Sequence, residues 1–438
     1  MNKFYFVIVK STIFLLLIFQ FLSFFALSND QISNDTNNCI AKIVFKGNYK
    51  TKPQIMRQEM IIKEGDPVDI KKIERSRQAI LDLELFKSVK TELTEHKDGK
   101  VITITVEEKY YILPLPRVGR SSDGDIFYGG VVEFNNLMGL NQTMKTSFVK
   151  KELNDSYLNE EQTFAFYYSY PRINGSAYQF ALDFDHKQSE IERKKNDLKS
   201  IYIGALTRFK CTLGYWLNKK GPSKGWQISN GIILDWKKYE YKKGIPDLYY
   251  DTDLVSLTTI IKYDATTNLG YNQKGKYFKY QLIYALKDLG SDVNNSRHTM
   301  IFRYYYPIPQ YSYTNLNFQF TMEYESNHLF DDYPFKLGGS SNLRGYSRES
   351  IQGDIYMLMN FEYLTPIVYN TLRGALFVDI GNAYATDKNI DLLSQNIGCG
   401  IGARWKIRSL VRTDLRLDFA YSFEEKNYRL YFGAKAMF

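Results

Sequence analysis

The residues best suited to a specific interaction lie in a glycine-rich segment at 336–346, KLGGSSNLRGY. Glycine adopts positive φ angles and lets another backbone come close. An arginine guanidinium binds two carboxylates at once through its planar set of N–H donors. We therefore expect Arg344 to be inserted among acidic groups inside the protein. The segment contributes six candidate residues: Gly338, Gly339, Leu343, Arg344, Gly345 and Tyr346.

Two acidic residues downstream of this segment are the candidate partners of Arg344. Glu362 lies in NFEYLTP (360–366), and Asp379 lies in FVDIGN (377–382). Both stretches alternate apolar and polar residues, so each carboxylate points to the polar side of a strand. The alternative is that Arg344 is exposed in a mobile loop and that both carboxylates are ordinary charges on a wet surface.

The sequence lacks the residues that nucleotide binding, hydrolysis or metal binding would require. The sequence contains no GxxxxGK[ST] or GxSxG motif, so neither nucleotide binding nor a hydrolase nucleophile is expected. The four histidines are dispersed and the cysteines form no CxxC pair, so we expect no metal site, no cofactor and no enzymatic activity. The sequence does not assign a disulfide to any two of Cys39, Cys211 and Cys399.

The composition narrows the class of protein. Of the 438 residues 16% are aromatic, and the mean hydropathy of −0.37 excludes a polytopic helical membrane protein. A β-barrel is not excluded, because alternating polar and apolar residues cancel in a hydropathy average. The net charge of +9 is spread along the chain, so nucleic acid is not an expected partner.

The N-terminus has the features of a secretory signal. Lys3 and Lys10 come before an apolar run at 11–25, and the small residues Ala26 and Ser28 suit a cleavage that follows. We therefore predict a signal peptide at 1–28. The alternative is an uncleaved anchor helix, because the apolar stretch approaches the roughly 20 residues that span a bilayer when the residues before Lys10 are included.

Residues 39–108 predict a small domain of the order βααββ. A strand, two helices and two further strands follow one another, with Thr51 and Asp69 at the predicted helix starts. Such a domain leaves a sheet edge to which an extended partner segment can add as a strand. The alternative is a rigid spacer without partner contacts. The next stretch, 109–120, contains two prolines and is predicted to be a linker.

The region from 121 to 438 predicts a long series of strands. In 411–421 four charged residues, which include Arg416 and Asp418, alternate with apolar residues. This pattern is typical of a strand between lipid and a water-filled lumen. A single strand of this kind also fits the edge of a soluble sandwich, so the interpretation depends on several such strands.

Sixteen strands are counted in this region, the first at 127–135, with 199–207 and 209–218 as two separate strands. An even number returns both chain ends to the same side. Closure is required because lipid offers no hydrogen-bond partner to a sheet edge. The predicted fold class is an all-β membrane protein: a 16-stranded antiparallel transmembrane β-barrel at 121–438, preceded by one small α+β (βααββ) domain.

Several short motifs occur together along the chain, and each is weak by itself. They are Ile43-x-Phe45-x-Gly47-Asn48, Glu64-Gly65-Asp66, the tetrapeptide Leu343–Tyr346, Asn360-x-Glu362 with its Thr-Pro turn, Phe377-x-Asp379-x-Gly381, and the terminal aromatic Phe438. With these motifs, residues 39–108 resemble a POTRA domain. The chain from 39 to 438 resembles the BamA/TamA outer-membrane assembly superfamily, whose members combine POTRA domains with a surface-antigen D15-type barrel, and it would be a single-POTRA member.

The resemblance implies how the candidate residues are arranged. In this superfamily the sixth extracellular loop folds into the barrel, so Arg344 would contact Asp379 and Glu362. Phe377 and Gly381 would belong to the same strand motif. The first and last strands would form a weak lateral seam, to which we assign Gly129, Gly130 and Phe438.

The resemblance also implies a function in the bacterial cell outer membrane, with the POTRA domain in the periplasm. That function is outer-membrane protein assembly or insertion, with the client engaged by POTRA strand addition and at the barrel seam. The alternatives are export of a partner protein, as in two-partner secretion, and a passive outer-membrane pore or surface antigen. Expected partners are the lipid bilayer, unfolded β-barrel client proteins, and periplasmic chaperones or accessory lipoproteins. A single POTRA unit departs from the several units usual in assembly factors and leaves the client open.

Overall fold

The computed structural model describes residues 39–120, 126–152, 160–195, 198–269, 272–327, 330, 333–368, 371–385, 394–406 and 414–434. The predicted signal peptide at 1–28 and the predicted seam residue Phe438 lie outside the described residues. Across these described ranges, every helix is too short or too polar to cross a membrane.

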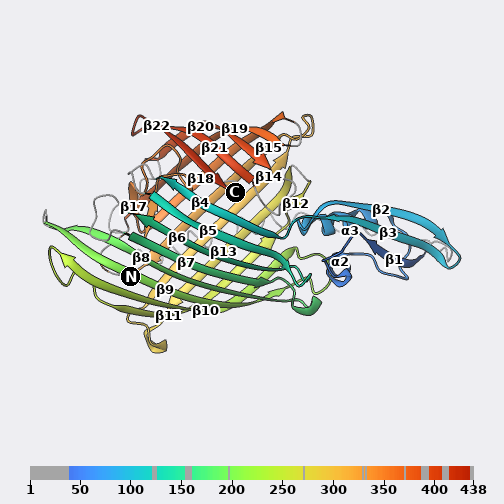
Figure 1. Cartoon of the computed structure of the whole chain (residues 1–438), viewed down its shortest axis with the longest axis horizontal. Helices are drawn as coiled ribbons and strands as arrows, with labels where there is room; N and C mark the ends of the chain where they lie inside the picture. The colour runs from blue at the N-terminus through green and yellow to red at the C-terminus, as the bar shows by residue number, and fades with distance from the viewer. Residues whose placement is uncertain are drawn as a thin grey trace, which may run out of the picture.

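The described chain begins with a small N-terminal domain, coloured blue in Figure 1. Its central strand is the last in sequence, and it runs parallel to the first strand and antiparallel to the second. The predicted cap of the second helix is present, because Asp69 accepts the backbone N–H of Lys71 at 2.8 Å. The elements are β1 (Ile40–Lys46), α2 (Pro53–Glu59), α3 (Ile70–Asp82), β2 (Phe86–His96) and β3 (Gly99–Glu108).

The rest of the chain forms one closed antiparallel barrel, in which β22 and β4 are the neighbours that complete the ring (Figure 1). Sixteen long strands are present in the described residues, and the two-residue strand β12 (Thr267–Asn268) lies beside one of them. The long strands are β4 (Ile112–Arg120), β5 (Ile126–Leu137), β6 (Gln142–Glu152), β7 (Glu160–Tyr170), β8 (Tyr178–Lys195), β9 (Leu198–Trp216), β10 (Gly225–Lys243), β11 (Thr252–Asp264), β13 (Gln273–Ala285), β14 (Asn295–Pro307), β15 (Asn315–Ser326), β18 (Ile355–Val368), β19 (Leu372–Tyr384), β20 (Asn396–Lys406), β21 (Asp414–Ser422) and β22 (Asn427–Ala434).

The strands have an apolar outer face and a more polar inner face. On β19 the outward residues Leu376 and Val378 are exposed, whereas the inward residues Phe377 and Asp379 are buried. The same alternation continues on β20, where Ile401 is exposed. Apolar side chains on the outside of a closed barrel face lipid, and the inner face supplies the polar groups of the lumen.

Two strand assignments differ from the sequence-based prediction. Residues 112–120, expected to be part of a linker, form β4, which pairs with β5 along its whole length. Proline is tolerated in a strand when its missing N–H faces away from the paired neighbour. The predicted strands 199–207 and 209–218 are one strand, β9, which pairs continuously with β8. The number sixteen is unchanged because the added β4 offsets the merged β9.

The N-terminal domain is docked on turns at one end of the barrel. Glu59 of α2 is buried and accepts hydrogen bonds from the backbone N–H of Ser223 at 2.6 Å and from its hydroxyl at 2.7 Å. Ser223 lies in the turn between β9 and β10. Arg172, in the turn between β7 and β8, donates to the same hydroxyl at 3.0 Å. Burial raises the pKa of the Glu59 carboxyl.

A second group of contacts docks the end of α3. Asp82 forms an ion pair with Lys224 and accepts the backbone N–H of Asn268 at 2.7 Å. Gln78 donates to the carbonyl of Asn268, also at 2.7 Å. Elsewhere Asn136, near the end of β5, donates to the hydroxyl of Thr51 at 2.8 Å. Contacts to several separate turns restrain both the position and the rotation of the domain on the barrel.

Candidate functional site

The connection between β15 and β18 folds into the barrel, and we call residues 335–353 the inward loop. It begins and ends with two short paired strands, β16 (Phe335–Leu337) and β17 (Ile351–Gly353). Gly338 and Gly339 follow β16 with φ angles of +110° and +106°. A Cβ at Gly338 would lie 2.0 Å from the carbonyl oxygen of Ser347. A glycine is therefore required for the chain to turn inward here.

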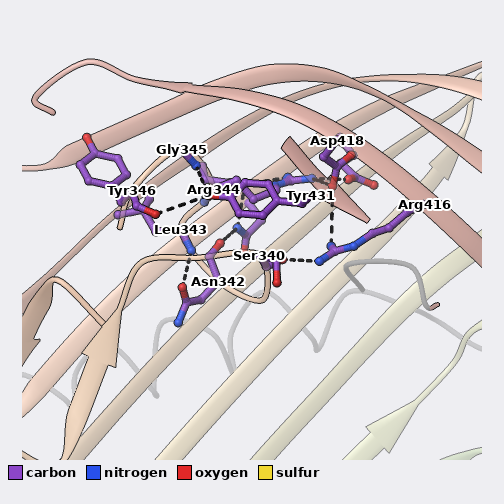
Figure 2. Close-up of polar contacts among 12 residues, drawn as sticks. Ser340, Asn342, Leu343, Arg344, Gly345, Tyr346, Arg416, Asp418 and Tyr431 are labelled. Carbon is purple, nitrogen blue, oxygen red and sulfur yellow. Dashed lines mark hydrogen bonds and ion pairs between the residues drawn. The ribbon is translucent and has the colours of Figure 1, made fainter. Parts of the chain in front are cut away.

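Arg344 in the inward loop is fully buried and binds two carboxylates on the barrel wall. Figure 2 shows it between Leu343 and Gly345, with the Tyr431 side chain beside it. Its Nε and Nη2 donate to the two oxygens of Asp379 at 2.7 and 2.8 Å. Its Nη1 donates to Glu362 at 2.9 Å, and its backbone N–H donates to Asp379 at 3.1 Å. The paired, parallel contacts to Asp379 are the strongest geometry that arginine offers a carboxylate.

Aromatic and amide groups complete the immediate surroundings of Arg344. The guanidinium carbon lies 3.5 Å from the centre of the Phe377 ring, so the cation stacks on an aromatic face. Asn360 donates to Asp379 at 2.8 Å and to the carbonyl of Asn342 at 3.0 Å. The arginine is therefore fixed by charge, stacking and hydrogen bonds together.

The charge network extends to three residues on β20 and β21. Asp418 accepts from Nη1 of Arg344 at 3.3 Å and from Arg404 at 2.5 Å, and Arg404 also pairs with Glu362. Arg416 lies 3.8 Å from Asp418 and donates to the carbonyl of Ser340 in the loop. All six charged groups are buried. Three guanidinium groups face three carboxylates, so the formal charges balance, as a buried ionic cluster requires.

The inner face of β20 makes room for the loop backbone. It carries Gly398, Gly400 and Gly402 at alternate positions, followed by Arg404. A Cβ at Gly398 would lie 2.0 Å from the carbonyl oxygen of Arg344, and one at Gly402 would lie 2.2 Å from Asp418. A larger residue at either position would push the loop or the carboxylate out of place.

The segment that follows Arg344 is held by β22 and the turn before it. The backbone N–H of Gly345 donates to the hydroxyl of Tyr431 at 3.1 Å, and Arg429 donates to the carbonyl of Gly345 at the same distance. Ser347 donates its backbone N–H to Glu425 at 3.0 Å. Tyr346 is buried and donates to the carbonyl of Ile397 at 3.0 Å. The loop is thereby tied to the last strand as well as to β18 and β19.

The structure thus brings together Arg344, Glu362 and Asp379 as the sequence suggested, with Phe377 in contact and Leu343 buried beside them. Gly381 lies on the same strand, where a Cβ would approach the carbonyl oxygen of Met357 to 2.8 Å.

The seam assignment of Gly129 and Gly130 is wrong. Both lie on β5, the second barrel strand, between β4 and β6. The error follows from treating 109–120 as a linker, which moved the first strand one position along the barrel.

Three network residues were not selected from the sequence: Arg404, Arg416 and Asp418. Arg416 and Asp418 were recognised only as inward charges of one strand. The signal that could have found Arg404 is the series GCGIGAR at 398–404, in which every inward residue before the arginine is glycine. A strand face without side chains indicates that another backbone lies against it.

The fold and the site define a β-barrel whose outer surface faces lipid. The barrel carries one small βααββ domain at one end and holds the inward loop inside its lumen. A family model described as the Omp85 superfamily domain matches residues 136–435, and one described as the surface antigen variable number repeat, POTRA, matches 39–109. The chain belongs to the Omp85 superfamily and has a POTRA domain at its N-terminal end. It is a bacterial outer-membrane protein, and its POTRA domain lies in the periplasm.

Two curated relatives are both described as outer membrane protein assembly factor BamA. The protein of Nitratidesulfovibrio vulgaris is 23% identical over 412 residues, which cover 88% of this chain and 48% of the relative. The protein of Neorickettsia risticii is 32% identical over 126 residues, which cover 28% of this chain and 17% of the relative. The chain therefore spans about half the length, or less, of the curated relatives it matches.

Solved structures share the fold at low identity. BamA from Haemophilus ducreyi lacking POTRA domains 1–3 has a TM-score of 0.54 at 15% identity, over 91% of this chain and 84% of that one. CdiB from Acinetobacter baumannii has a TM-score of 0.59 at 14% identity, over 91% and 73%. These similarities describe the architecture and do not separate the two kinds of protein.

Proposed function

We propose that this protein is an outer-membrane protein assembly factor. It receives unfolded β-barrel clients at the POTRA sheet edge and passes their strands to the seam between β4 and β22. The naming of both curated relatives supports this function, as does the Omp85 family match. The observation that carries the proposal is a single accessible sheet edge in a POTRA domain that is docked at the periplasmic end of the barrel.

The β1 edge of the POTRA sheet is already occupied. The segment after α2 lies against it. The N–H of Ile40 donates to the carbonyl of Asp66, and the carbonyl of Ile40 accepts the N–H of Gly65, both at 2.8 Å. The N–H of Ile43 is bonded to the carboxylate of Glu64 at 3.0 Å. A client strand therefore has no access to this side of the sheet.

The β2 edge is the accessible one. β2 lies at the end of the order β1-β3-β2, with β3 as its neighbour in the sheet. Its distal half, from Lys90 to His96, is mostly exposed, and Leu93 in the middle of it places an apolar side chain in solvent. An extended segment can add here by backbone hydrogen bonds, with the side chain of Leu93 contributing an apolar contact.

The first test is depletion of the protein followed by a comparison of the outer-membrane proteome. We expect barrel proteins to decrease while lipoproteins remain, and an unchanged proteome would contradict the assembly function. A photo-crosslinker at Leu93 should then capture unfolded barrel proteins, whereas one at Ile70, an exposed residue at the start of α3, should not. Capture of one secreted protein in place of barrel proteins would favour export.

The export and pore alternatives both require an open path through the lumen. The inward loop occupies part of that lumen, and it is held there by six buried charges. We expect low ion conductance in planar bilayers for the unaltered protein. A large, stable conductance would favour a passive pore over an assembly factor.

A further inference from the structure

An apolar groove crosses the lipid-facing surface of the barrel over five neighbouring strands, from β14 to β20. Its volume is about 630 Å³. A second row of side chains, from Tyr306 on β14 to Ile401 on β20, runs beside the first and forms the other wall. The first row has one residue from each strand, placed side by side by the register: Tyr304, Phe318, Phe361, Val378 and Cys399.

The groove runs obliquely through the bilayer. Tyr304 lies three residues before the end of β14, and the turn that follows contacts the turn before β13 through Asn272 and Thr314, so this end is the POTRA end. Cys399 is the fourth residue of β20, which begins at the opposite end of the barrel. Strands spaced about 4.8 Å apart give five of them a width of about 19 Å. One leaflet contributes about 15 Å of hydrocarbon, so the groove has room for one extended acyl chain.

Two lysines lie where the groove reaches the POTRA end. Lys276 of β13 is opposite Tyr304 in the register, and its Nζ lies 5.8 Å from the centre of the Tyr304 ring. Lys274 lies two residues earlier on the same face of the strand, and both lysines are exposed. Within the described part of the chain, no carboxylate pairs with either lysine. Their charges are therefore available to an anionic group at the membrane surface.

The docked POTRA domain adds positive charge at the same place. Helix α3 lies beside β12, which directly precedes β13 (Figure 1). Arg75 of α3 is exposed and lines one small pocket together with Lys274. Glu74 lines this pocket as well, but its carboxylate is paired with Arg77 at 2.6 Å. The POTRA end of the groove therefore carries a surplus of positive charge.

We propose that the groove binds one anionic phospholipid of the periplasmic leaflet. The phosphate lies at Lys274 and Lys276, and one acyl chain follows the groove towards Cys399. Lysines at a membrane surface attract anionic headgroups, and Tyr304 and Tyr306 lie at the interfacial level where tyrosine is favoured. A lipid of the outer leaflet would have its phosphates at the opposite end of the barrel. A zwitterionic lipid would bring no net charge to the lysines. This site does not depend on the proposed assembly function.

The first experiment measures lipid selection. The purified protein, in a non-ionic detergent, is titrated with palmitoyl-oleoyl phosphatidylglycerol and separately with phosphatidylcholine that carries the same chains. Native mass spectrometry counts the lipids that stay bound, and we expect one phosphatidylglycerol to bind more tightly than phosphatidylcholine. Lys274→Gln with Lys276→Gln should weaken phosphatidylglycerol binding about 30-fold, since each lysine near an anionic headgroup contributes about fivefold.

The matched control for these substitutions removes two exposed lysines from another strand. Lys238→Gln with Lys242→Gln makes the same change in net charge at the end of β10 that lies away from the POTRA domain. The affinity for phosphatidylglycerol should stay as in the unaltered protein. Equal affinity of the unaltered protein for the two lipids would overturn the proposal. An affinity that survives Lys274→Gln with Lys276→Gln would do the same.

The second experiment locates the acyl chain. Cys399 is a free thiol in the groove wall. In a chain with Cys39→Ser and Cys211→Ser, phosphatidylglycerol should slow the labelling of Cys399 by N-ethylmaleimide. Val378→Phe narrows the groove beside Cys399 and keeps both lysines, so the lipid should no longer change the labelling rate.

Leu257→Phe is the control for the narrowed groove, because Leu257 is an exposed residue on the outer face of β11, away from the groove. Lipid should protect Cys399 in this variant as in the unaltered protein. Tight phosphatidylglycerol binding that leaves Cys399 labelling unchanged would overturn the proposal, because the chain would then lie elsewhere. The Val378→Phe comparison tests the groove even if the lysine variant does not fold.

Discussion

Replacing Arg344 with alanine is the most direct test of the locked loop. The substitution removes every contact that the guanidinium makes with Asp379, Glu362 and Asp418. Arg404 remains to pair with Glu362 and Asp418. Asp379 loses its cation and keeps the hydrogen bond from Asn360 at 2.8 Å. The variant therefore leaves one buried carboxylate without a compensating charge.

The expected cost follows from that unpaired charge. Removing one partner of a buried ion pair costs about 3–5 kcal/mol. Since about 1.4 kcal/mol corresponds to a factor of ten, the equilibrium between the seated and released loop shifts by about 150- to 4,000-fold towards release. Water that enters the vacated space brings the effect to the lower end of this range.

Hydrogen exchange of the loop measures this shift. In the seated loop the backbone N–H groups of Arg344, Gly345 and Ser347 are bonded to Asp379, Tyr431 and Glu425. Their exchange should accelerate by the same factor in the variant. Proteinase K added to whole cells should cleave the released loop within residues 338–350.

Arg348→Ala is the matched control for this measurement. Arg348 lies four residues further along the same loop, and its side chain is 66% exposed beside Glu349. Exposed pairs contribute little to stability, so exchange and cleavage should match the unaltered protein. If Arg344→Ala and Arg348→Ala exchange alike, the ionic cluster does not hold the loop and the reasoning fails.

Three further predictions concern the lock and the docked domain. Gly398→Ala should release the loop, because the added Cβ would collide with the carbonyl oxygen of Arg344. The control is Gly374→Ala, whose Cβ would come no closer than 3.5 Å to a neighbouring atom, so hydrogen exchange of the loop should be unchanged. Asp418→Asn leaves a surplus positive charge in the cluster and should cost about 1–3 kcal/mol of loop seating, so protease resistance equal to the unaltered protein would count against it. Because burial raises the pKa of Glu59, the docked POTRA domain holds this proton more readily than the released one. Docking should therefore strengthen as pH falls through the raised pKa and weaken above it. Hydrogen exchange of α2 should show this pH dependence, and Glu59→Gln should abolish it.

Local periodicity was sufficient to predict the outline of the fold. Alternation in segments such as 355–368 reports directly which side chains face lipid, because successive residues of a strand point to opposite faces. The pairing of Arg344 with Asp379 was only one of two interpretations that the residues allowed. A lone arginine in a glycine-rich segment fits either insertion among carboxylates or exposure in a mobile loop, and the resemblance to the outer-membrane assembly superfamily favoured insertion.

The first strand was missed because proline is a poor strand former on average. Pro114 and Pro116 are acceptable only on an edge that faces away from the paired strand, and the sequence does not say which edge that is. The two parts of β9 were separated for a related reason. A strand of 19 residues exceeds the length that a bilayer requires, so a break was expected where none occurs.

The class of this protein could be predicted from the sequence alone. Three features indicate it: a POTRA-like segment, a long series of amphipathic strands, and a glycine-rich loop with a single arginine that can pair with a carboxylate. These are properties of neighbours in the chain. Tertiary structure decided which strand begins the barrel and which charges join Arg344. Those depend on register between strands, and register couples residues that are distant in sequence, such as Gly398 with Ser422. A shift of one residue would reverse every inward and outward position.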